Sequence, residues 1–258
     1  MGVILADGLA KSYGSVEALS GLSLDVSRGE LFGFLGPNGA GKTTTIRILT
    51  GQLAPDLGTA EVLGVDPLAE PIETRRRVGI LPEQGMPPSF LTPREYFDFV
   101  GRVRDLEPDL VAQRVERWAD RLAFGGKLDT LHTDLSRGQQ QKVMIAQAFL
   151  HEPEVVFIDE PLANLDPLVQ EQVKRFLVAY AADDNAVFVS THNIDVAEEI
   201  CTRVGIVADG RLVAERSLEG ARADDGDGVA DERSLLETFL DHVEAADPRD
   251  TPTPTVSD

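Results

Sequence analysis

The stretch that decides the fold is Gly36-Pro37-Asn38-Gly39-Ala40-Gly41-Lys42-Thr43, which matches the pattern G-x-x-x-x-G-K-[ST] at every fixed position. The strand-like run 30–35 precedes it, and residues 42–50 have the pattern of a helix that ends at Gly51. Glycines let the backbone of such a loop curl so that successive N–H groups point at phosphate oxygens, and the N-terminus of the helix adds partial positive charge. The sequence therefore predicts a phosphate-binding loop between a strand and a helix.

The side chains of this loop predict what it holds. Lys42 is expected to reach the β- and γ-phosphates of a nucleotide, and the Thr43 hydroxyl to bind Mg²⁺. The loop residues 36–41 and Thr44 would complete the contacts to the nucleotide. A chance glycine-rich turn is the alternative, and the strand before the loop and the helix after it argue against that alternative.

A second motif supplies two carboxylates. The apolar run Val155-Val156-Phe157-Ile158 reads as a buried strand, and Asp159 and Glu160 follow it directly. Open α/β sheets bind their ligands at the carboxyl ends of the strands. Successive strand residues point to opposite sides, so the two carboxylates are expected to differ in role. Asp159 would hold Mg²⁺, and Glu160 would polarise the attacking water.

Elsewhere apolar runs alternate with helical patterns, which predicts an α/β fold with a parallel sheet. Thr92-Pro93-Arg94-Glu95 reads as a helix start with a capping box, and about 90–150 reads as an inserted helical subdomain. Asp209-Gly210 between two apolar runs indicates a β-hairpin. The expected organisation is a domain at 1–218, a short helical segment at 219–243 and a disordered acidic tail at 244–258.

The chain of 258 residues carries a formal net charge of −20, with 44 acidic residues against 24 basic ones. Such a field repels nucleic acid, so we expect no nucleic-acid partner. Segment 219–258 contributes −9 and the rest of the chain −11, so the tail alone does not explain the charge. An acid-rich, lysine-poor composition suggests a protein from a halophile. The one cysteine, Cys201, excludes an internal disulfide, and no run is long enough to span a bilayer.

The order of these motifs resembles the ATP-binding subunit of ABC transporters over roughly residues 3–217. The family signature LSGGQ stands here as Leu135-Ser136-Arg137-Gly138-Gln139, directly before a helical pattern at 140–150. The resemblance implies a P-loop NTPase core with a parallel sheet, an antiparallel β subdomain and the helical insertion. It also implies ATP and Mg²⁺ as ligands and a head-to-tail dimer, in which Ser136, Gly138 and Gln139 contact the ATP of the other subunit. Arg137 replaces the usual glycine, and its effect stays open.

Four further residues match family positions. Tyr13 would stack on adenine, and Gln84 would touch Mg²⁺ and take part in catalysis. His192 would hold the γ-phosphate, and Asp166 belongs to a loop that the family uses across the dimer. In that loop Ala163 replaces a common serine. Together with Lys42 and Glu160, residues Gln84 and His192 form the expected catalytic set.

The resemblance also implies a partner and a location. The expected protein is a peripheral ATPase on the cytoplasmic face of the cell membrane, bound to an integral membrane permease, and export is favoured over import. It would pair with itself or with a related subunit. Aromatic residues between 85 and 100 would either face the permease or fill the helical core. The alternatives are an ABC ATPase without a membrane partner and a module that binds ATP without hydrolysing it.

Overall fold

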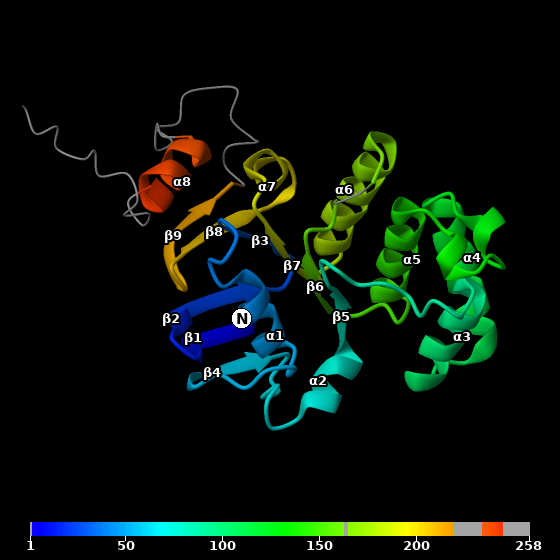
Figure 1. Cartoon of the computed structure of the whole chain (residues 1–258), viewed down its shortest axis with the longest axis horizontal. Coiled ribbons are helices and arrows are strands. Elements are labelled where there is room, and N and C mark those ends of the chain that lie inside the picture. Colours follow the sequence, from blue (N-terminus) through cyan, green and yellow to red (C-terminus); the bar gives the residue numbers. More distant parts are fainter. Residues whose placement is uncertain (1, 163–164, 219–233, 245–258) are drawn as a thin grey trace, which may run out of the picture.

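Two sheets and a helical layer make up the part of the chain that the computed structural model describes, residues 2–162, 165–218 and 234–244 (Figure 1). The larger sheet has six strands in the order β5-β6-β7-β3-β8-β9. All neighbouring pairs are parallel except β8 and β9. Its strands are β5 (Val78–Leu81), β6 (Val155–Asp159), β7 (Ala186–Thr191), β3 (Leu31–Leu35), β8 (Arg203–Ala208) and β9 (Arg211–Ser217).

The central strands are buried on both faces, which explains why they read as unbroken apolar runs. On one face Val156, Ile158 and Val187 pack with the residues of the helices that follow the strands. On the other face Phe157 and Phe188 pack with the smaller sheet and the helix after the phosphate-binding loop. Burial of a Phe or Val side chain stabilises a fold by roughly 1.5–3 kcal/mol, so each of these strand residues contributes to the stability of the core.

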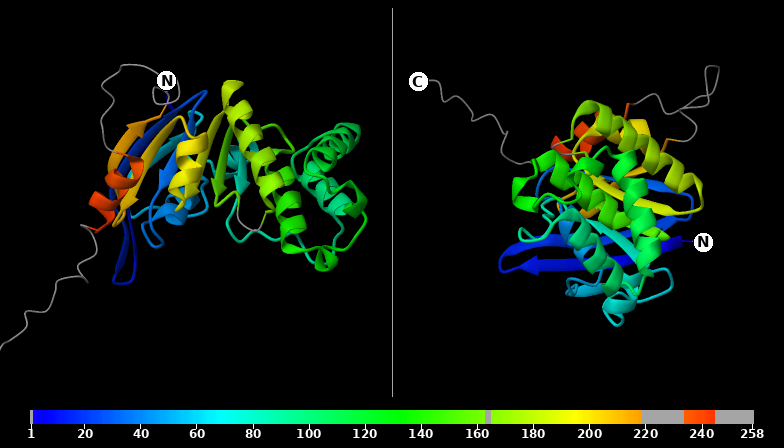
Figure 2. Two further views of the ribbon diagram at one scale, coloured as in Figure 1. Left: turned by 90° about the horizontal axis from the view of Figure 1, so that it is seen from above. Right: turned by 90° about the vertical axis from the view of Figure 1, so that its right-hand side faces the viewer.

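A three-stranded antiparallel sheet, in the order β2-β1-β4, covers the second face. Its strands are β1 (Gly2–Tyr13), β2 (Val16–Ser27) and β4 (Leu57–Val62). Helix α1 (Lys42–Leu49) contacts both sheets. Figure 2 shows these layers from two further sides, with the helical layer at the end far from the smaller sheet.

The helical layer begins where the sequence predicts. Thr92 caps α3 (Pro93–Val103), Pro93 is its first residue, and the capping box with Glu95 is formed. The helical pattern divides at Asp105, whose φ of 54° ends the first helix. The other helices of this layer are α4 (Pro108–Arg121) and α5 (Arg137–Phe149), separated by the short 3-10 turns η1 (Gly125–Lys127) and η2 (His132–Asp134). Of the aromatic residues before position 100, Phe97 is fully buried, whereas Phe90 is 76% and Phe99 55% exposed.

The remaining helices are α2 (Pro71–Arg77), α6 (Pro167–Ala182), α7 (Ile194–Ile200) and α8 (Leu235–Glu244). Helix α2 was not expected. The hairpin of β8 and β9 turns at Asp209 and Gly210, which both have positive φ as the sequence predicts. Helix α8 lies at the end of the helical segment expected at 219–243, of which residues 219–233 are outside the described residues, and the expected tail is also outside them except for Glu244. No helix in the described ranges is long and apolar enough to cross a membrane.

Candidate functional site

The phosphate-binding loop joins the buried strand β3 to α1 with the geometry that the sequence predicts. Gly41, with φ 104°, precedes the first residue of α1, and a Cβ there would lie 2.6 Å from the carbonyl oxygen of Ala18. A Cβ on Gly36 would lie 2.4 Å from the carbonyl oxygen of Val207. Because neither position has room for a side chain, the loop must be glycine there, and its backbone N–H groups stay accessible.

Lys42 extends back over its own loop. Its Nζ donates to the carbonyl oxygens of Gly36 at 2.7 Å and Pro37 at 3.0 Å, and only 7% of the residue is exposed. Burial lowers the pKa of this ammonium, and the carboxylates of Glu160, Asp159 and Glu83 oppose that shift. A buried cation among backbone dipoles is the arrangement that favours a phosphate ligand.

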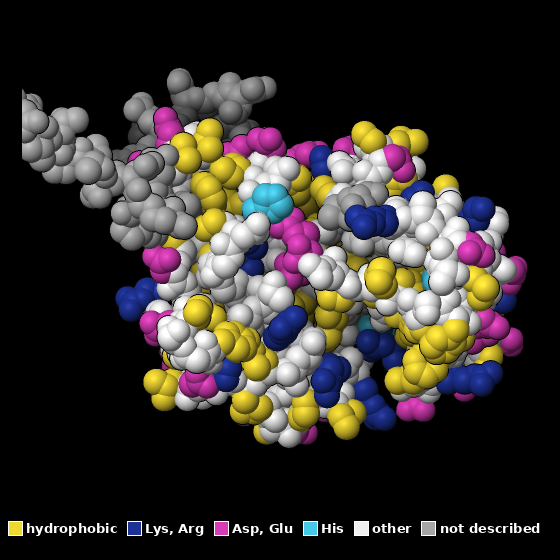
Figure 3. Space-filling model, viewed as in Figure 1, with side chains coloured by type: hydrophobic (Ala, Val, Ile, Leu, Met, Phe, Trp, Pro, Cys, Tyr) yellow, Lys and Arg dark blue, Asp and Glu magenta, His cyan; other side chains and the backbone are white. Residues whose placement is uncertain are grey.

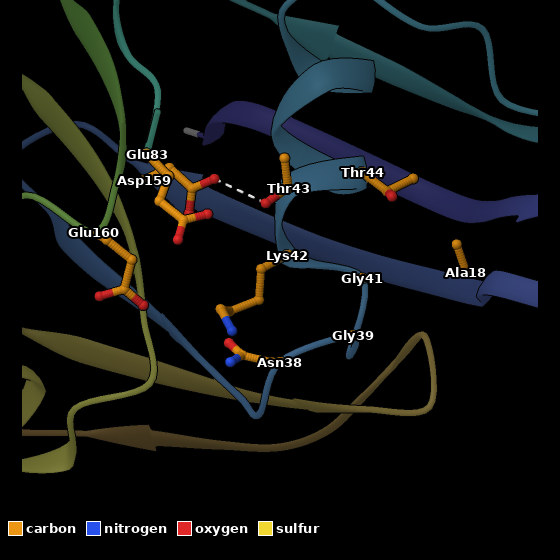
Figure 4. A pocket seen from close by; sticks show the side chains of 10 residues that line it. All are labelled: Ala18, Asn38, Gly39, Gly41, Lys42, Thr43, Thr44, Glu83, Asp159 and Glu160. Carbon is orange, nitrogen blue, oxygen red and sulfur yellow. Dashed lines mark hydrogen bonds between the residues drawn. The ribbon is translucent and has the colours of Figure 1, made fainter. Parts of the chain in front are cut away.

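The candidate metal site is formed where α1 meets β6. The Thr43 hydroxyl donates to Oδ2 of Asp159 at 2.8 Å, although 116 residues separate them (Figure 4). Ser190 on the neighbouring strand β7 donates to Oδ1 of the same carboxylate. Asp159 is 3% exposed, so its oxygens are fixed in direction. A hydroxyl and a carboxylate oxygen at one point suit Mg²⁺, which prefers oxygen ligands and keeps others from phosphate and water.

Glu160 has surroundings of its own. Its φ of 51° takes it out of strand β6, and its N–H donates to the carbonyl oxygen of Ser190 at 3.0 Å. Its carboxylate accepts from the Thr191 hydroxyl at 3.2 Å, from the backbone N–H of His192 at 3.0 Å and from Nδ1 of His192 at 2.6 Å. The two carboxylates have different hydrogen-bond partners, as expected. The reason is the left-handed backbone conformation of Glu160, not the alternation of side chains along a strand.

These elements enclose a pocket of about 420 Å³. It is lined by Ala18, Asn38, Gly39, Gly41, Lys42, Thr43, Thr44, Glu83, Asp159 and Glu160 (Figure 4). Gln84 borders an adjoining pocket of about 310 Å³ that also touches Thr43 and Asp159. The structure therefore brings the expected loop, metal and water-activating residues together, with Gln84 at their edge.

Sequence reasoning missed four residues of this site, one of which is Thr191, the donor to Glu160 from β7. Ala18 comes from β2, Glu83 lies beside the expected Gln84, and Ser190 supports Asp159 from β7. Glu83 could have been suspected as a neighbour of Gln84. Ala18 and Ser190 carry no local signal, because only the sheet pairing brings them here.

Five expected residues lie away from this pocket. Tyr13 is 47% exposed at the end of β1, and Asp166 caps α6 by accepting from the N–H of Val169 at 3.1 Å. Ser136 and Gln139 form a capping box at the N-terminus of α5. Gly138 belongs to the first turn of the same helix, which begins with the exposed Arg137. Ala163 lies outside the described residues.

Comparison with known proteins agrees with this geometry. Residues 19–163 match the family model described as ABC transporter. The daunorubicin/doxorubicin resistance ATP-binding protein DrrA of Streptomyces peucetius is 33% identical over 226 residues, covering 88% of this chain and 68% of the relative. The Nod factor export ATP-binding protein I of Ralstonia nicotianae is 30% identical over 254 residues, covering 95% and 79%.

An uncharacterized ABC transporter ATP-binding protein of Synechocystis is 37% identical over 205 residues, which are 79% of this chain and 57% of that relative. A solved ATP-binding subunit of an ABC transporter superposes with a TM-score of 0.83 at 29% identity, covering 93% of this chain and 98% of the solved one. From the site, the fold and these relatives together, the chain belongs to the ABC transporter family of ATP-binding proteins.

Proposed function

We propose that this chain is the ATP-hydrolysing subunit of an ABC exporter, which powers transport through a separate integral membrane permease. The observation that carries the proposal is the convergence of Lys42, Thr43, Asp159 and Glu160 on one pocket. The names of two relatives, a drug resistance protein and a Nod factor export protein, support export as the direction.

Lys42 and the loop would bind the triphosphate. The Lys42 ammonium lies over the loop, 2.7 Å from the carbonyl oxygen of Gly36. It would exchange this carbonyl oxygen for the phosphate oxygens of ATP. The N–H groups of 39–44 would provide the remaining donors, since they precede or begin helix α1. Tyr13 would stack on the adenine from the end of β1.

Thr43 and Asp159 would hold Mg²⁺, with Gln84 reaching it from the adjoining pocket. Bound Mg²⁺ would withdraw charge from the phosphate oxygens. Among the described residues no group of three or more His, Cys, Asp or Glu side chains could bind a metal on its own. Metal binding is therefore expected to depend on the nucleotide.

Glu160 would orient the attacking water and take its proton. Thr191 and His192 hold the carboxylate through three hydrogen bonds, which fixes its orientation. A positioned base of this kind contributes roughly 10²–10⁴-fold to a rate. The His192 side chain is 63% exposed, so it can leave Glu160 and contact the γ-phosphate.

A second subunit would complete the site, either an identical copy or a related one. Ser136 and Arg137 are exposed at the N-terminus of α5 and line no part of this chain's own pocket. A helix N-terminus attracts phosphate, so Ser136, Gly138 and Gln139 would act on the ATP of the opposite subunit. Asp166 would take part in the same interface.

The permease would bind beside α3, and the protein would act on the cytoplasmic face of the cell membrane. Figure 3 shows hydrophobic side chains gathered over the region of α3. The exposed large apolar residues of α3 and the loop before it are Met86, Phe90, Phe99 and Val103. We further propose that 1–218 is the ATPase domain with its helical subdomain at about 90–150, and that 219–258 is an appendage.

Paired ATPase assays test hydrolysis. Glu160→Gln should keep ATP binding and lower the hydrolysis rate by about 10²–10⁴-fold. The control Glu73→Gln, on the exposed side of α2, should match the wild type. Equal low rates for the wild type and Glu160→Gln would instead favour a module that binds ATP without hydrolysing it.

Co-purification tests the transporter assignment. The tagged protein, extracted gently in molar KCl, should retain an integral membrane protein in stoichiometric amount. Recovery only with ribosomes or other cytoplasmic factors would contradict the proposed partner and leave the ATP chemistry in place.

A further inference from the structure

A second cavity, of about 340 Å³, lies among the helices α4, α5 and α6, away from the nucleotide pocket. Arg117, Trp118 and Arg121 of α4 line it from one side, and Phe176 and Tyr180 of α6 from the other. Phe149 at the end of α5 joins them. Figure 1 shows α5 standing between these two helices. We name it the α4–α6 cavity; none of its residues belongs to the proposed ATP site.

Four aromatic rings form the apolar wall of this cavity. Trp118 and Phe176 meet edge to face with centroids 4.8 Å apart, and Phe149 and Phe176 do the same at 4.8 Å. Phe149 and Tyr180 meet edge to face at 5.0 Å. Such packing holds each ring in a fixed orientation, so the wall is preformed rather than adaptable. The Tyr180 hydroxyl is committed to the carbonyl oxygen of Pro153 at 2.5 Å, which leaves the ring as its contribution to the wall.

Positive charge surrounds the wall. The Arg121 guanidinium carbon lies 4.7 Å from the ring centroid of Phe176 and 5.3 Å from that of Trp118. Among the described residues Arg121 has no carboxylate partner. The one carboxylate of the cavity, Glu152, is shared between Arg114 and Arg117, the latter at 3.2 Å. The whole chain has a net charge of −20, whereas the rim of this cavity has more positive than negative side chains.

We propose that the α4–α6 cavity binds a planar aromatic anion, with its ring against the part of the aromatic wall that Arg121 leaves open, beside Tyr180, and its acidic group on Arg121. An aromatic wall buries a flat ring, and a guanidinium pairs with a carboxylate or sulfonate through parallel hydrogen bonds. The volume is at the lower end of the range for small-molecule sites, so the ligand is of drug size or smaller. Side chains of both α4 and α6 line the cavity. A bound ligand would therefore contact the helical layer and the helix α6 at the same time. The proposal stands independently of ATP hydrolysis.

The chain contains its own reporter, because Trp118 is its one tryptophan. The probe is 8-anilinonaphthalene-1-sulfonate, an aromatic anion with a planar naphthalene ring, added to the nucleotide-free full chain. We expect saturable quenching of Trp118 fluorescence at one probe per chain. The neutral N-phenyl-1-naphthylamine has nearly the same rings without the sulfonate, and it should bind at least about tenfold more weakly.

Arg121→Gln should weaken binding of the anionic probe about tenfold and leave the affinity for the neutral probe unchanged. Arg102→Gln, an exposed position on α3 outside the cavity, is the matched control and should bind like the wild type. Arg117→Gln provides a second test, because it leaves the stacked Arg121 in place. It should also weaken binding of the anionic probe. Thermal melting confirms that each variant is folded. Equal affinity for the two probes, or wild-type affinity in both cavity variants, would overturn the proposal and leave Arg121 as a cap on the aromatic cluster.

Discussion

At the scale of single residues, the site depends on groups that fix Asp159 from two directions. Thr43 reaches Oδ2 from α1, and Ser190 reaches Oδ1 from β7. Ser190 is fully buried, and Asp159 is 3% exposed. A buried carboxylate that loses a hydrogen-bond donor is free to turn. Ser190 is therefore expected to act on the metal through Asp159 rather than by touching it.

Ser190→Ala should weaken ATP binding in the presence of Mg²⁺ by about 10–100-fold, which is the usual cost of losing a partner of a metal ligand. ATP binding in EDTA should change little, because Lys42 and the loop are untouched. Titration calorimetry with and without Mg²⁺ measures both affinities. Ser23→Ala on β2, whose hydroxyl accepts from Gly8 at the other face of the smaller sheet, is the control. An equal loss in both buffers would show that Ser190 supports the loop rather than the metal.

At the scale of elements, the N-terminus of α5 has one structural role, the helix cap, and one proposed role in binding ATP. Ser136 accepts from the N–H of Gln139 at 3.3 Å, and its own N–H donates to Oε1 of Gln139 at 2.9 Å. This capping box is a structural role that needs no ligand. The proposed contact of Ser136 with the opposite subunit's ATP is a separate role. Substitutions that treat the two roles differently can separate them.

Ser136→Asp should retain the stability of the chain, because aspartate caps a helix as well as serine does. It should abolish ATP-dependent dimers, because a carboxylate would meet the γ-phosphate of the partner's ATP. Ser136→Ala should cost about 1 kcal/mol of unfolding free energy through loss of the cap. Urea unfolding measures stability, and sedimentation in the Glu160→Gln background measures dimers. Dimers of Ser136→Asp at wild-type strength would refute the proposed contact.

Elements also show where local pattern was insufficient. The sequence indicated α3 through its capping box, but α2 has only seven residues, three consecutive arginines and one buried residue, Thr74. A helix with almost no apolar face gives no periodic signal. Phe97 and Phe99 were indistinguishable in the sequence, and packing against α4 and α5 decided that Phe97 would be buried and Phe99 exposed.

At the scale of the whole molecule, the large negative charge is expected to affect the stability of the fold. The net charge of −20 comes with only five lysines, and at low salt the folded chain repels itself more than the expanded one does. Salt shortens the screening distance from about 10 Å at 0.1 M to about 3 Å at 1 M, which removes most of that repulsion. The hypothesis of a halophilic protein follows from this balance.

Thermal stability should therefore rise with KCl, by about 10 °C or more in Tm between 0.1 M and 2 M. Differential scanning calorimetry on the full chain without nucleotide measures it. Potassium chloride is the suitable salt because it screens charge with little effect on apolar burial, unlike sulfate. A Tm that does not change with KCl would contradict the halophile hypothesis and leave the excess of acidic residues unexplained.

The sequence by itself determined the features that are local: the phosphate-binding loop, the strand that ends in Asp159, the capped start of α3 and the Asp209-Gly210 hairpin. Each needs only neighbouring residues, because glycine conformation, strand burial and helix caps act over a few positions. The tertiary structure decided which distant residues meet. Ser190 and Ala18 join the site through strand pairing, and Trp118 and Phe176 enclose a cavity through helix packing, across 58 positions. Contacts of this kind depend on how whole elements pack, and no local pattern encodes them.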